Sequence, residues 1–341
     1  MKDNFLLDSL TKLMSIDSPT GFTREAADYV VKVADELGYK SRVTNKGCVE
    51  VYMPGESSDK KVGISAHIDT LGAMVRSITG EGKLRFTKIG GPLMSTVEGE
   101  YCRVYTRDGR VYTGTFMSDS PSVHVFDDAG TLPRDEGTMW VRLDEIVKTK
   151  DDVQKLGISA GDFIAFDPRT TITEKGFVKS RFLDDKASAA CLLAVMNDFS
   201  KQGIKPKNDT VFVFTVFEET GHGGAAVGEG LDEILALDMG CIGKDLTCTE
   251  YDVSICAKDS GGPYDYELTT RLINMAKEIG IKYAVDIYPR YGSDVGAYWR
   301  AGHDAKGALI GPGIQASHGT ERTHVTALED TVALVKRYLK G

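Results

Sequence analysis

The stretch TVFVFTVFEETGHGG, residues 210–224, decides the fold of this chain. Its first eight residues are almost all β-branched or aromatic, which is typical of a strand buried on both faces inside a parallel sheet. The run ends at Glu218 and Glu219, and a glycine-rich turn follows. Adjacent carboxylates at the end of a buried strand are costly, so a metal ion or a shared proton is expected to compensate them, unless the pair lies exposed in a turn. Such strand ends also border the crevice where α/β proteins bind ligands.

The composition favours an ordinary globular protein with two domains, because 341 residues exceed what one compact core usually holds. The net charge of −9 argues against nucleic acid or an anionic membrane as a partner. No apolar run approaches the ~18 residues of a membrane span, and the first residues lack the apolar core of a signal peptide. The six cysteines form no C-x-x-C pair, so we expect reduced thiols and a cytoplasmic location.

The pattern of predicted secondary structure changes twice along the chain. Residues 1–69 and 173–341 alternate strand-like and helix-like segments, which predicts an α/β fold with a mostly parallel sheet flanked by helices. Residues 70–172 instead contain short alternating strands separated by glycine, proline and Asp-Gly turns, with one short helix near 147–157. We therefore expect one α/β domain in two parts, 1–69 and 173–341, and a small all-β domain inserted as 70–172.

Acidic and imidazole side chains recur where the predicted strands end. They are His67 and Asp69, Asp184 and Asp185, Glu218 and Glu219, and Asp238, with His318 and His324 in the loop before the last helix. Each of these motifs alone also has a purely structural interpretation, such as a hydrogen-bonded His–Asp pair or a helix cap. Their joint occurrence at one sheet edge predicts a metal site, and nitrogen and carboxylate ligands without thiolates suit Zn, Co or Mn. Two such ions sharing a carboxylate form a hydrolytic site for amide or phosphate bonds.

The order H-x-D, D-D-K-x-S, E-E-x-G, L-D-M-G and T-H resembles the glutamyl-aminopeptidase-like, tetrahedral-assembly family of co-catalytic metallo-aminopeptidases. The resemblance covers nearly the whole chain, and an insertion directly after H-x-D is typical of this family among two-metal peptidases. It implies hydrolysis of N-terminal residues from short peptides with two divalent ions per subunit. It also implies a homo-oligomer, in which the β domain forms dimers and six dimers form a hollow dodecamer.

The resemblance also implies a ligand set. His67 and Asp238 would bind one metal, and Asp184 would bridge both metals and precede a cis peptide bond. Glu219 and His324 would complete the ligand set of the second metal. His324 is chosen because T-H directly before the last helix is the family arrangement.

Other roles follow from the same resemblance. Glu218 would be the general base, and Asp69 would orient the imidazole of His67. His318 in ASHG competes with His324 for the place of the last ligand. Residues 290–299 resemble a loop near the specificity pocket, so Arg290 and Asp294 are candidate substrate contacts, although Gly-Ser-Asp also fits a plain turn.

His222 is a third candidate contact with substrate, against the plain reading of a structural or exposed histidine. Two other functions compete with the aminopeptidase hypothesis. A glycoside hydrolase would need paired carboxylates about 5–9 Å apart, whereas neighbours on a strand, as expected for Glu218 and Glu219, point to opposite faces. A non-catalytic metal-binding protein on a peptidase fold is the other alternative, since a fold does not imply a function. The preferred N-terminal residue and the metal stay open.

Overall fold

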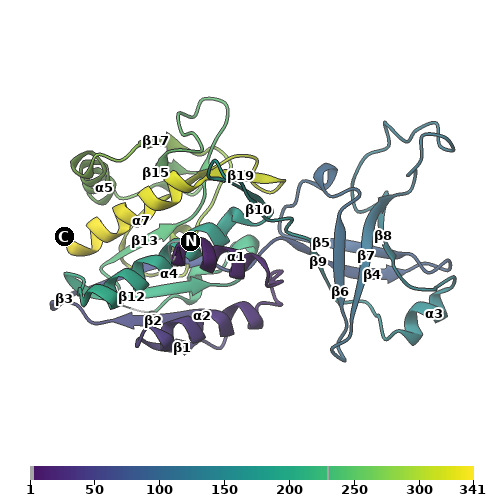
Figure 1. Ribbon diagram of the computed structural model, residues 1–341, viewed down its shortest axis with the longest axis horizontal. Helices are drawn as coiled ribbons and strands as arrows, with labels where there is room; N and C mark the ends of the chain where they lie inside the picture. Colours follow the sequence, from purple (N-terminus) through teal and green to yellow (C-terminus); the bar gives the residue numbers. More distant parts are fainter. Residues whose placement is uncertain (1–3, 229) are drawn as a thin grey trace. The chain divides into compact units, whose positions relative to one another are not determined.

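The computed structural model describes residues 4–228 and 230–341 and shows a mixed α/β unit with a small β-barrel inserted in its chain (Figure 1). One compact unit comprises residues 1–70 and 169–341, and the other comprises residues 71–168. The boundaries expected from the sequence, after residues 69 and 172, differ from these by one and four residues.

A ten-stranded sheet forms the middle of the larger unit. Its order is β1-β2-β12-β3-β13-β18-β15-β16, with β14 beside β18 and β17 beside β15. The strands are β1 (Lys40–Val43), β2 (Val49–Met53), β3 (Ser57–His67), β12 (Asn208–Thr215), β13 (Glu233–Leu237), β14 (Gly240–Cys241), β15 (Val253–Asp259), β16 (Gly262–Pro263), β17 (Tyr283–Ile287) and β18 (Lys306–Ile314). A separate antiparallel sheet contains β10 (Thr171–Ile172), β11 (Phe177–Ser180) and β19 (Glu321–His324).

The large sheet is mixed: among the described residues five strand pairs are parallel and four are antiparallel, so the predicted parallel arrangement describes its centre but not its edges. Its four central strands, β12, β3, β13 and β18, run parallel to one another. The pairs β1–β2, β2–β12, β15–β18 and β15–β16 are antiparallel. The short turn between β1 and β2 allows only an antiparallel pairing, because a parallel connection needs a long crossover.

Strand β12 lies in the middle of the sheet, between β2 and β3, as the apolar run predicted. Phe212, Val213 and Phe214 have no exposed surface, so side chains on both faces of the strand are buried. Burial of an aromatic or branched side chain stabilises the fold by about 1.5–3 kcal/mol, which fixes the position of the strand and of the residues that follow it.

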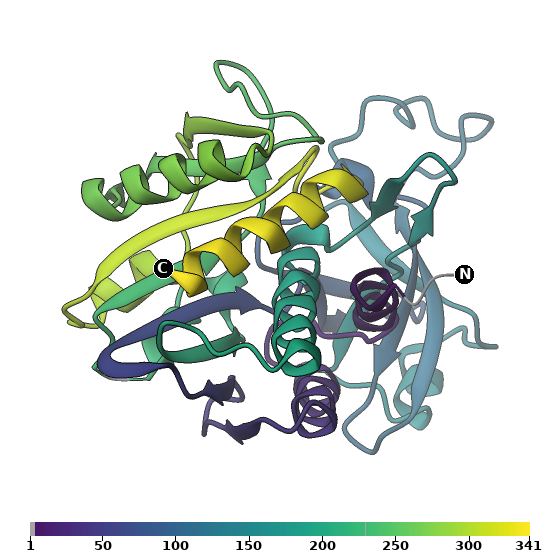
Figure 2. The ribbon, with the colours of Figure 1, turned by 60° about the vertical axis from the view of Figure 1, so that its left-hand side comes forward.

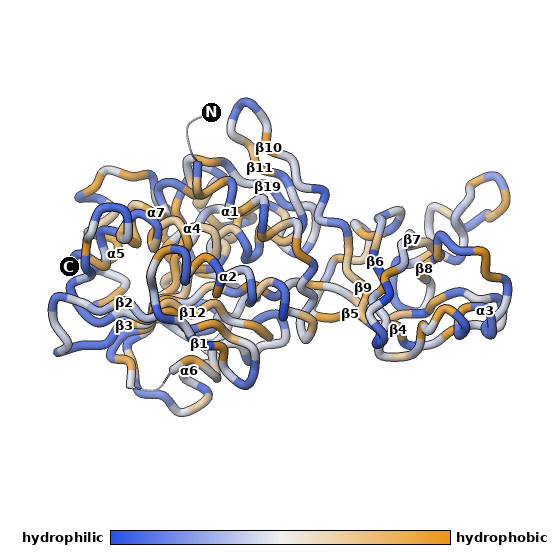
Figure 3. The backbone as a smooth tube through the Cα atoms, turned by 60° about the horizontal axis from the view of Figure 1, so that its bottom comes forward, coloured by the Kyte–Doolittle hydropathy of each residue, from blue (hydrophilic) through white to orange (hydrophobic). Residues whose placement is uncertain are grey.

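Helices cover both faces of the sheet. They are α1 (Phe5–Met14), α2 (Arg24–Glu36), α4 (Leu183–Gln202), α5 (Tyr266–Ile279), α6 (Asp294–Arg300) and α7 (Val325–Lys340), with short 3-10 turns η2 (Glu218–Thr220) and η3 (Gly224–Ala226). Helices α4 and α7 lie side by side over one face (Figure 2). Helix α6 packs on β13 and β18 from the other side (Figure 3), where Gly307 leaves room for Val295 and Trp299.

The inserted unit is a closed antiparallel barrel in the order β4-β5-β8-β7-β6-β9. Its strands are β4 (Gly72–Ile78), β5 (Leu84–Ile89), β6 (Tyr101–Tyr105), β7 (Val111–Ser118), β8 (Met139–Leu143) and β9 (Phe163–Phe166). Phe86, Phe116 and Phe166 fill its interior, with successive rings 5.0 Å apart and edge to face. The barrel unit also carries η1 (Met94–Thr96) and one short helix, α3 (Lys150–Lys155), near the predicted position. Among the described residues, no helix is both long and apolar enough to cross a membrane.

Candidate metal centre

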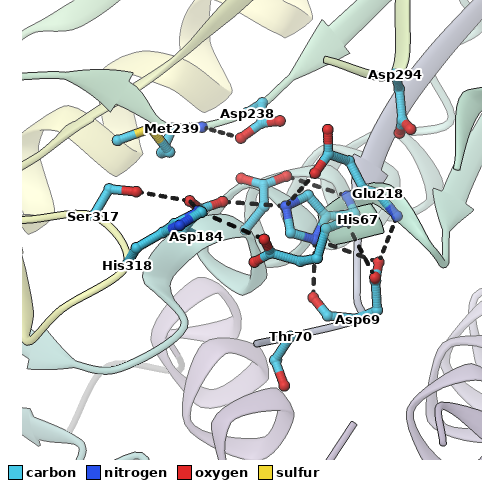
Figure 4. Close-up of polar contacts among 12 residues, drawn as sticks. His67, Asp69, Thr70, Asp184, Glu218, Asp238, Met239, Asp294, Ser317 and His318 are labelled. Atoms are coloured by element: carbon cyan, nitrogen blue, oxygen red, sulfur yellow. Dashed lines mark hydrogen bonds and ion pairs between the residues drawn. The ribbon is translucent and has the colours of Figure 1, made fainter. Parts of the chain in front are cut away.

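Three parallel strands end at the same edge of the large sheet and place acidic and imidazole side chains there (Figure 4). His67 is the last residue of β3, Glu218 follows β12, and Asp238 follows β13. Asp184 reaches the same place from the start of α4, and its peptide bond to Asp185 is cis, as expected. The sheet topology therefore assembles the cluster that the order of the motifs predicted.

Two groups of side chains have the spacing of metal ligands. His67, Glu218 and Asp238 each offer one atom within 4.8 Å of the others, and so do His67, Asp184 and Glu219. His67 Nε2 lies 3.1 Å from Asp184 Oδ1 and 3.8 Å from Glu218 Oε2. All five residues were predicted as ligands or as the base.

Local hydrogen bonds fix the His67 imidazole. Its Nδ1 lies 2.9 Å from the Asp69 backbone carbonyl and 3.5 Å from Oδ1 of the same residue, and the His67 amide donates to Asp185 Oδ2. The Asp69 carboxylate in turn accepts hydrogen bonds from the Thr20 hydroxyl at 2.7 Å and from the Glu218 amide at 3.2 Å. Asp69 thus ties the end of β3 to the turn after β12, in keeping with a positioning role.

Glu218 and Glu219 do not lie on a strand, contrary to the geometry assumed from the sequence. Strand β12 ends at Thr215, and Phe217 adopts a left-handed φ of 68° before the pair enters a 3-10 turn. The turn brings both carboxylates to the cluster, since Glu219 Oε2 lies 3.5 Å from His318 Nε2 and Glu218 Oε2 faces His67. The two carboxylates therefore do not point to opposite faces of a strand.

The expectation for His324 needs correction. Its Nε2 lies 2.8 Å from the Lys175 carbonyl, its Nδ1 lies 3.0 Å from the Thr326 hydroxyl, and its ring packs against Phe177 and Tyr251. The structure does not bring it to the carboxylates, because the last residue of β19 is paired with β11, away from the sheet edge.

His318, the competing candidate, does reach the cluster. Its Nε2 lies 3.5 Å from Asp184 Oδ2 and 3.5 Å from Glu219 Oε2. The backbone of His318 has a left-handed φ of 65°, and its amide donates to the Glu321 carboxylate at 3.2 Å. Glu321 also accepts from the Asp184 amide at 3.1 Å and so connects the two segments. No sequence pattern pointed to Glu321 or to Ser317, whose hydroxyl donates to Asp184 Oδ2 at 2.8 Å.

The three candidate substrate contacts lie in different surroundings in the structure. Arg290 lines the pocket over the carboxylates, together with Arg300, Tyr291 and Cys241. His222 is exposed and stacks on Phe217, with ring centroids 5.0 Å apart.

Asp294, the third candidate, is buried beneath the cluster. It begins α6, accepts a hydrogen bond from the Thr215 hydroxyl, and lies near Glu218 (Figure 4). The sequence predicted a loop there, but Ser293 and the apolar residues after Asp294 start a short helix.

Burial and neighbouring negative charges raise the pKa values of most carboxylates in the cluster. Burial raises the pKa of Glu218 and of Glu219 well above their usual range, and it raises the pKa of Asp238 to about 7, with the Asp184 charge adding to the effect. Burial would also raise the pKa of Asp184, but the hydrogen bond and charge of His67 outweigh it and the pKa is lowered.

One oxygen of the cluster is also without a partner. Within the described residues, Glu219 Oε1 is buried and has no hydrogen bond, which is costly for a carboxylate. A divalent cation would satisfy this oxygen and offset the crowded negative charge. The imidazole and carboxylate donors fit Zn, Co or Mn.

Comparisons with known proteins agree with this geometry. The family model of the M42 glutamyl aminopeptidases matches residues 47–334. "Putative aminopeptidase YhfE" of Bacillus subtilis is 43% identical over 336 residues, which cover 98% of this chain and 97% of that protein. The crystal structure of a TET aminopeptidase from a marine sediment Thaumarchaeota archaeon has a TM-score of 0.90 at 21% identity, covering 98% of this chain and 96% of that one.

A dodecamer structure of PhTET1-12s has a TM-score of 0.85 at 21% identity, covering 97% of this chain and 98% of that one. These two structures, at low identity, show the fold. The family match over most of the chain shows more: the chain belongs to the M42 glutamyl aminopeptidase family and is a hydrolase of peptide bonds.

Proposed function

We propose that the protein is a metal-dependent aminopeptidase that removes N-terminal residues from short peptides and holds two divalent cations per chain. The observation that carries this proposal is the pair of ligand groups at one sheet edge, with a buried Glu219 oxygen that lacks a partner. Family membership supplies the reaction class, and the buried cluster supplies the place where it would occur.

Asp184 is the residue that would bridge the two ions. Its Oδ1 faces His67 Nε2 at 3.1 Å and its Oδ2 faces His318 Nε2 at 3.5 Å, so its two oxygens point to two different imidazoles. We assign His67, Asp184 and Asp238 to one cation, and Asp184, Glu219 and His318 to the other. His318 thus takes the role first given to His324.

Two divalent cations at this place would lower the pKa of a water molecule and polarise the scissile carbonyl group. Glu218 is the general base in this proposal, because its carboxylate lies among the candidate ligands while both cations are assigned to other residues. Glu218 would accept a proton from the attacking water. The same carboxyl group would then give that proton to the leaving amine.

Arg290 stays a proposed contact with the substrate, because it lines the pocket over the carboxylates. Asp294 acts through Glu218 rather than on the substrate, since it is buried behind the turn. His222 lies outside the residues that line this pocket and has no proposed contact with the substrate.

The test is release of N-terminal residues from a peptide panel, before and after a chelator, with Zn, Co and Mn each added back. Each peptide is paired with its N-acetylated form. The proposal expects cleavage of the free peptides only, abolished by the chelator and restored by at least one ion. Cleavage of the acetylated forms would indicate an endopeptidase instead. Chelator-resistant hydrolysis of a glucan would favour the glycoside hydrolase alternative.

We also propose a homo-oligomer built from dimers, up to a dodecamer, in which the inserted barrel unit forms contacts. Exposed apolar side chains of this unit support it, notably Val123, Val125 and Ile146. Light scattering after size exclusion should give a mass that is a multiple of the dimer, and a stable monomer would contradict the proposal. A cytoplasmic location is supported by the thiols of Cys48, Cys191, Cys241, Cys248 and Cys256, which form no disulfide among the described residues, and cell fractionation tests it.

A further inference from the structure

Tyr291 is a residue of the pocket to which the ligand scheme gives no role. It lies in the segment between β17 and α6 and lines the pocket beside Asp184, Glu218 and Asp238. Its hydroxyl oxygen is buried and has no hydrogen-bond partner among the described residues. The hydroxyl lies near Asp238, whose ionised form it favours, but the geometry of a hydrogen bond is not met. Because an unsatisfied buried hydroxyl is unfavourable, such a group calls for an explanation.

The position of Tyr291 is fixed through its backbone and through its ring. Its backbone amide donates to the Ser260 hydroxyl at 3.2 Å, and its carbonyl accepts from the Ser260 amide at 3.1 Å. Its ring meets the buried ring of Tyr288 edge to face, with centroids 5.1 Å apart. The hydroxyl is therefore held in place before any substrate binds, as an effective catalytic donor requires.

Three other donors that line the pocket have partners, and Arg290 is already proposed as a contact with the substrate. Arg300 donates to the Gly221 carbonyl at 3.1 Å, Ser317 donates to Asp184, and His318 faces two carboxylates. A phenol is protonated at neutral pH and can donate one hydrogen bond. In amide hydrolysis, the carbonyl oxygen is the atom that gains negative charge, and it needs a donor among surroundings that are otherwise rich in carboxylates.

We propose that the Tyr291 hydroxyl donates a hydrogen bond to the carbonyl oxygen of the scissile peptide bond as that oxygen gains negative charge. This inference rests on the proposed aminopeptidase function. It makes Tyr291 a catalytic residue that supplements the cations, and it explains why the hydroxyl is buried at the ligand cluster without a partner.

The test compares Tyr291→Phe with Tyr288→Phe in the metal-loaded protein. Tyr288 is the matched control because its hydroxyl is paired with Ser254 and it does not line the pocket. We expect Tyr291→Phe to lower kcat by about 10²–10³-fold, as loss of one oxyanion donor does, with KM and metal affinity unchanged. Tyr288→Phe should leave kcat within about threefold, since it removes no donor to the reacting oxygen.

Binding provides a second measurement. A phosphonate analogue of an amino acid, which has a tetrahedral anionic centre, should bind Tyr291→Phe about 10²–10³-fold more weakly, while the free amino acid binds both proteins equally. Unchanged kcat and analogue affinity would overturn the inference. A parallel loss of metal affinity would overturn it too, because Tyr291 would then position Asp238. If the unsubstituted protein neither cleaves peptides nor binds the analogue, the proposed function itself fails.

Discussion

Replacing His318 or His324 by alanine distinguishes the two candidates for the last ligand. The Nε2 atom of His318 lies 3.5 Å from an oxygen of Asp184 and 3.5 Å from an oxygen of Glu219. His318→Ala would leave the second cation with two carboxylates from the proposed set. Since changes to groups that only orient a ligand already weaken metal binding about 10–100-fold, we expect loss of this ligand to weaken one site more than about 100-fold. That factor corresponds to more than about 2.7 kcal/mol.

Titration calorimetry of the metal-depleted protein measures this effect. His318→Ala should bind one equivalent of Zn with nearly unchanged affinity and lose the other, whereas His324→Ala should keep both. His324→Ala, the control, still removes a hydrogen bond to the Lys175 carbonyl and a ring packed against Tyr251. The unfolding free energy of this variant should therefore fall by about 1–3 kcal/mol. Loss of a metal site in His324→Ala, with both sites intact in His318→Ala, would refute the assignment.

Three further substitutions test separate parts of the account. Glu218→Gln keeps the shape of the side chain but cannot accept a proton, so kcat should fall about 10²–10⁴-fold with both metals bound; unimpaired turnover would remove the base assignment. Lys186→Met should lower the unfolding free energy by about 2–4 kcal/mol in denaturant titration, because its buried ammonium donates to the Leu13 and Ile16 carbonyls at 3.0 and 2.6 Å; an unchanged midpoint would contradict this. Glu233→Gln should destabilise the protein at neutral pH, since hydrogen bonds from Arg271 and from a buried tyrosine outweigh burial and lower the pKa of Glu233. A lowered pKa stabilises the fold above the unfolded-state value, and this contribution is lost as pH falls through the folded-state value; the stability gap between the two proteins should therefore close in acid, and a constant gap would refute this reading.

Much of the cluster could be predicted because it follows from strand order. The apolar run of β12 marks a central strand, and parallel strands end at one edge, so the residues after them meet there. His67 and Asp238 come directly from that rule. The prediction of Asp184 as a metal ligand depended on the family resemblance as well. Asp184 precedes a helix, and its acidic neighbour could equally be a helix cap.

The misjudged parts depend on loops, whose paths no periodicity describes. The left-handed Phe217 turns Glu218 and Glu219 toward one site, which a strand could not do. His318 and His324 are six residues apart in sequence, and only the pairing of β19 with β11 separates them in space. The hydroxyl of Tyr291 and the carboxylate of Glu321 reach the site from segments without a motif.

The antiparallel edges of the sheet were also missed. Strand-like segments do not reveal their direction when the connection is short. At one edge of the sheet, the short segment between β1 and β2 makes this pair antiparallel. Toward the other edge, β15 runs antiparallel to β18. Edge pairing decides the class of the sheet but not the position of the cluster.

The most direct test of the central claim is a titration of the metal-depleted protein with Zn, Co or Mn, in which bound metal and release of an N-terminal residue are followed together. The account predicts no turnover without metal, and activity that rises to a plateau when two ions per chain are bound. Undiminished turnover by protein shown to contain no metal would contradict it, and so would two bound ions without cleavage of any peptide in the panel.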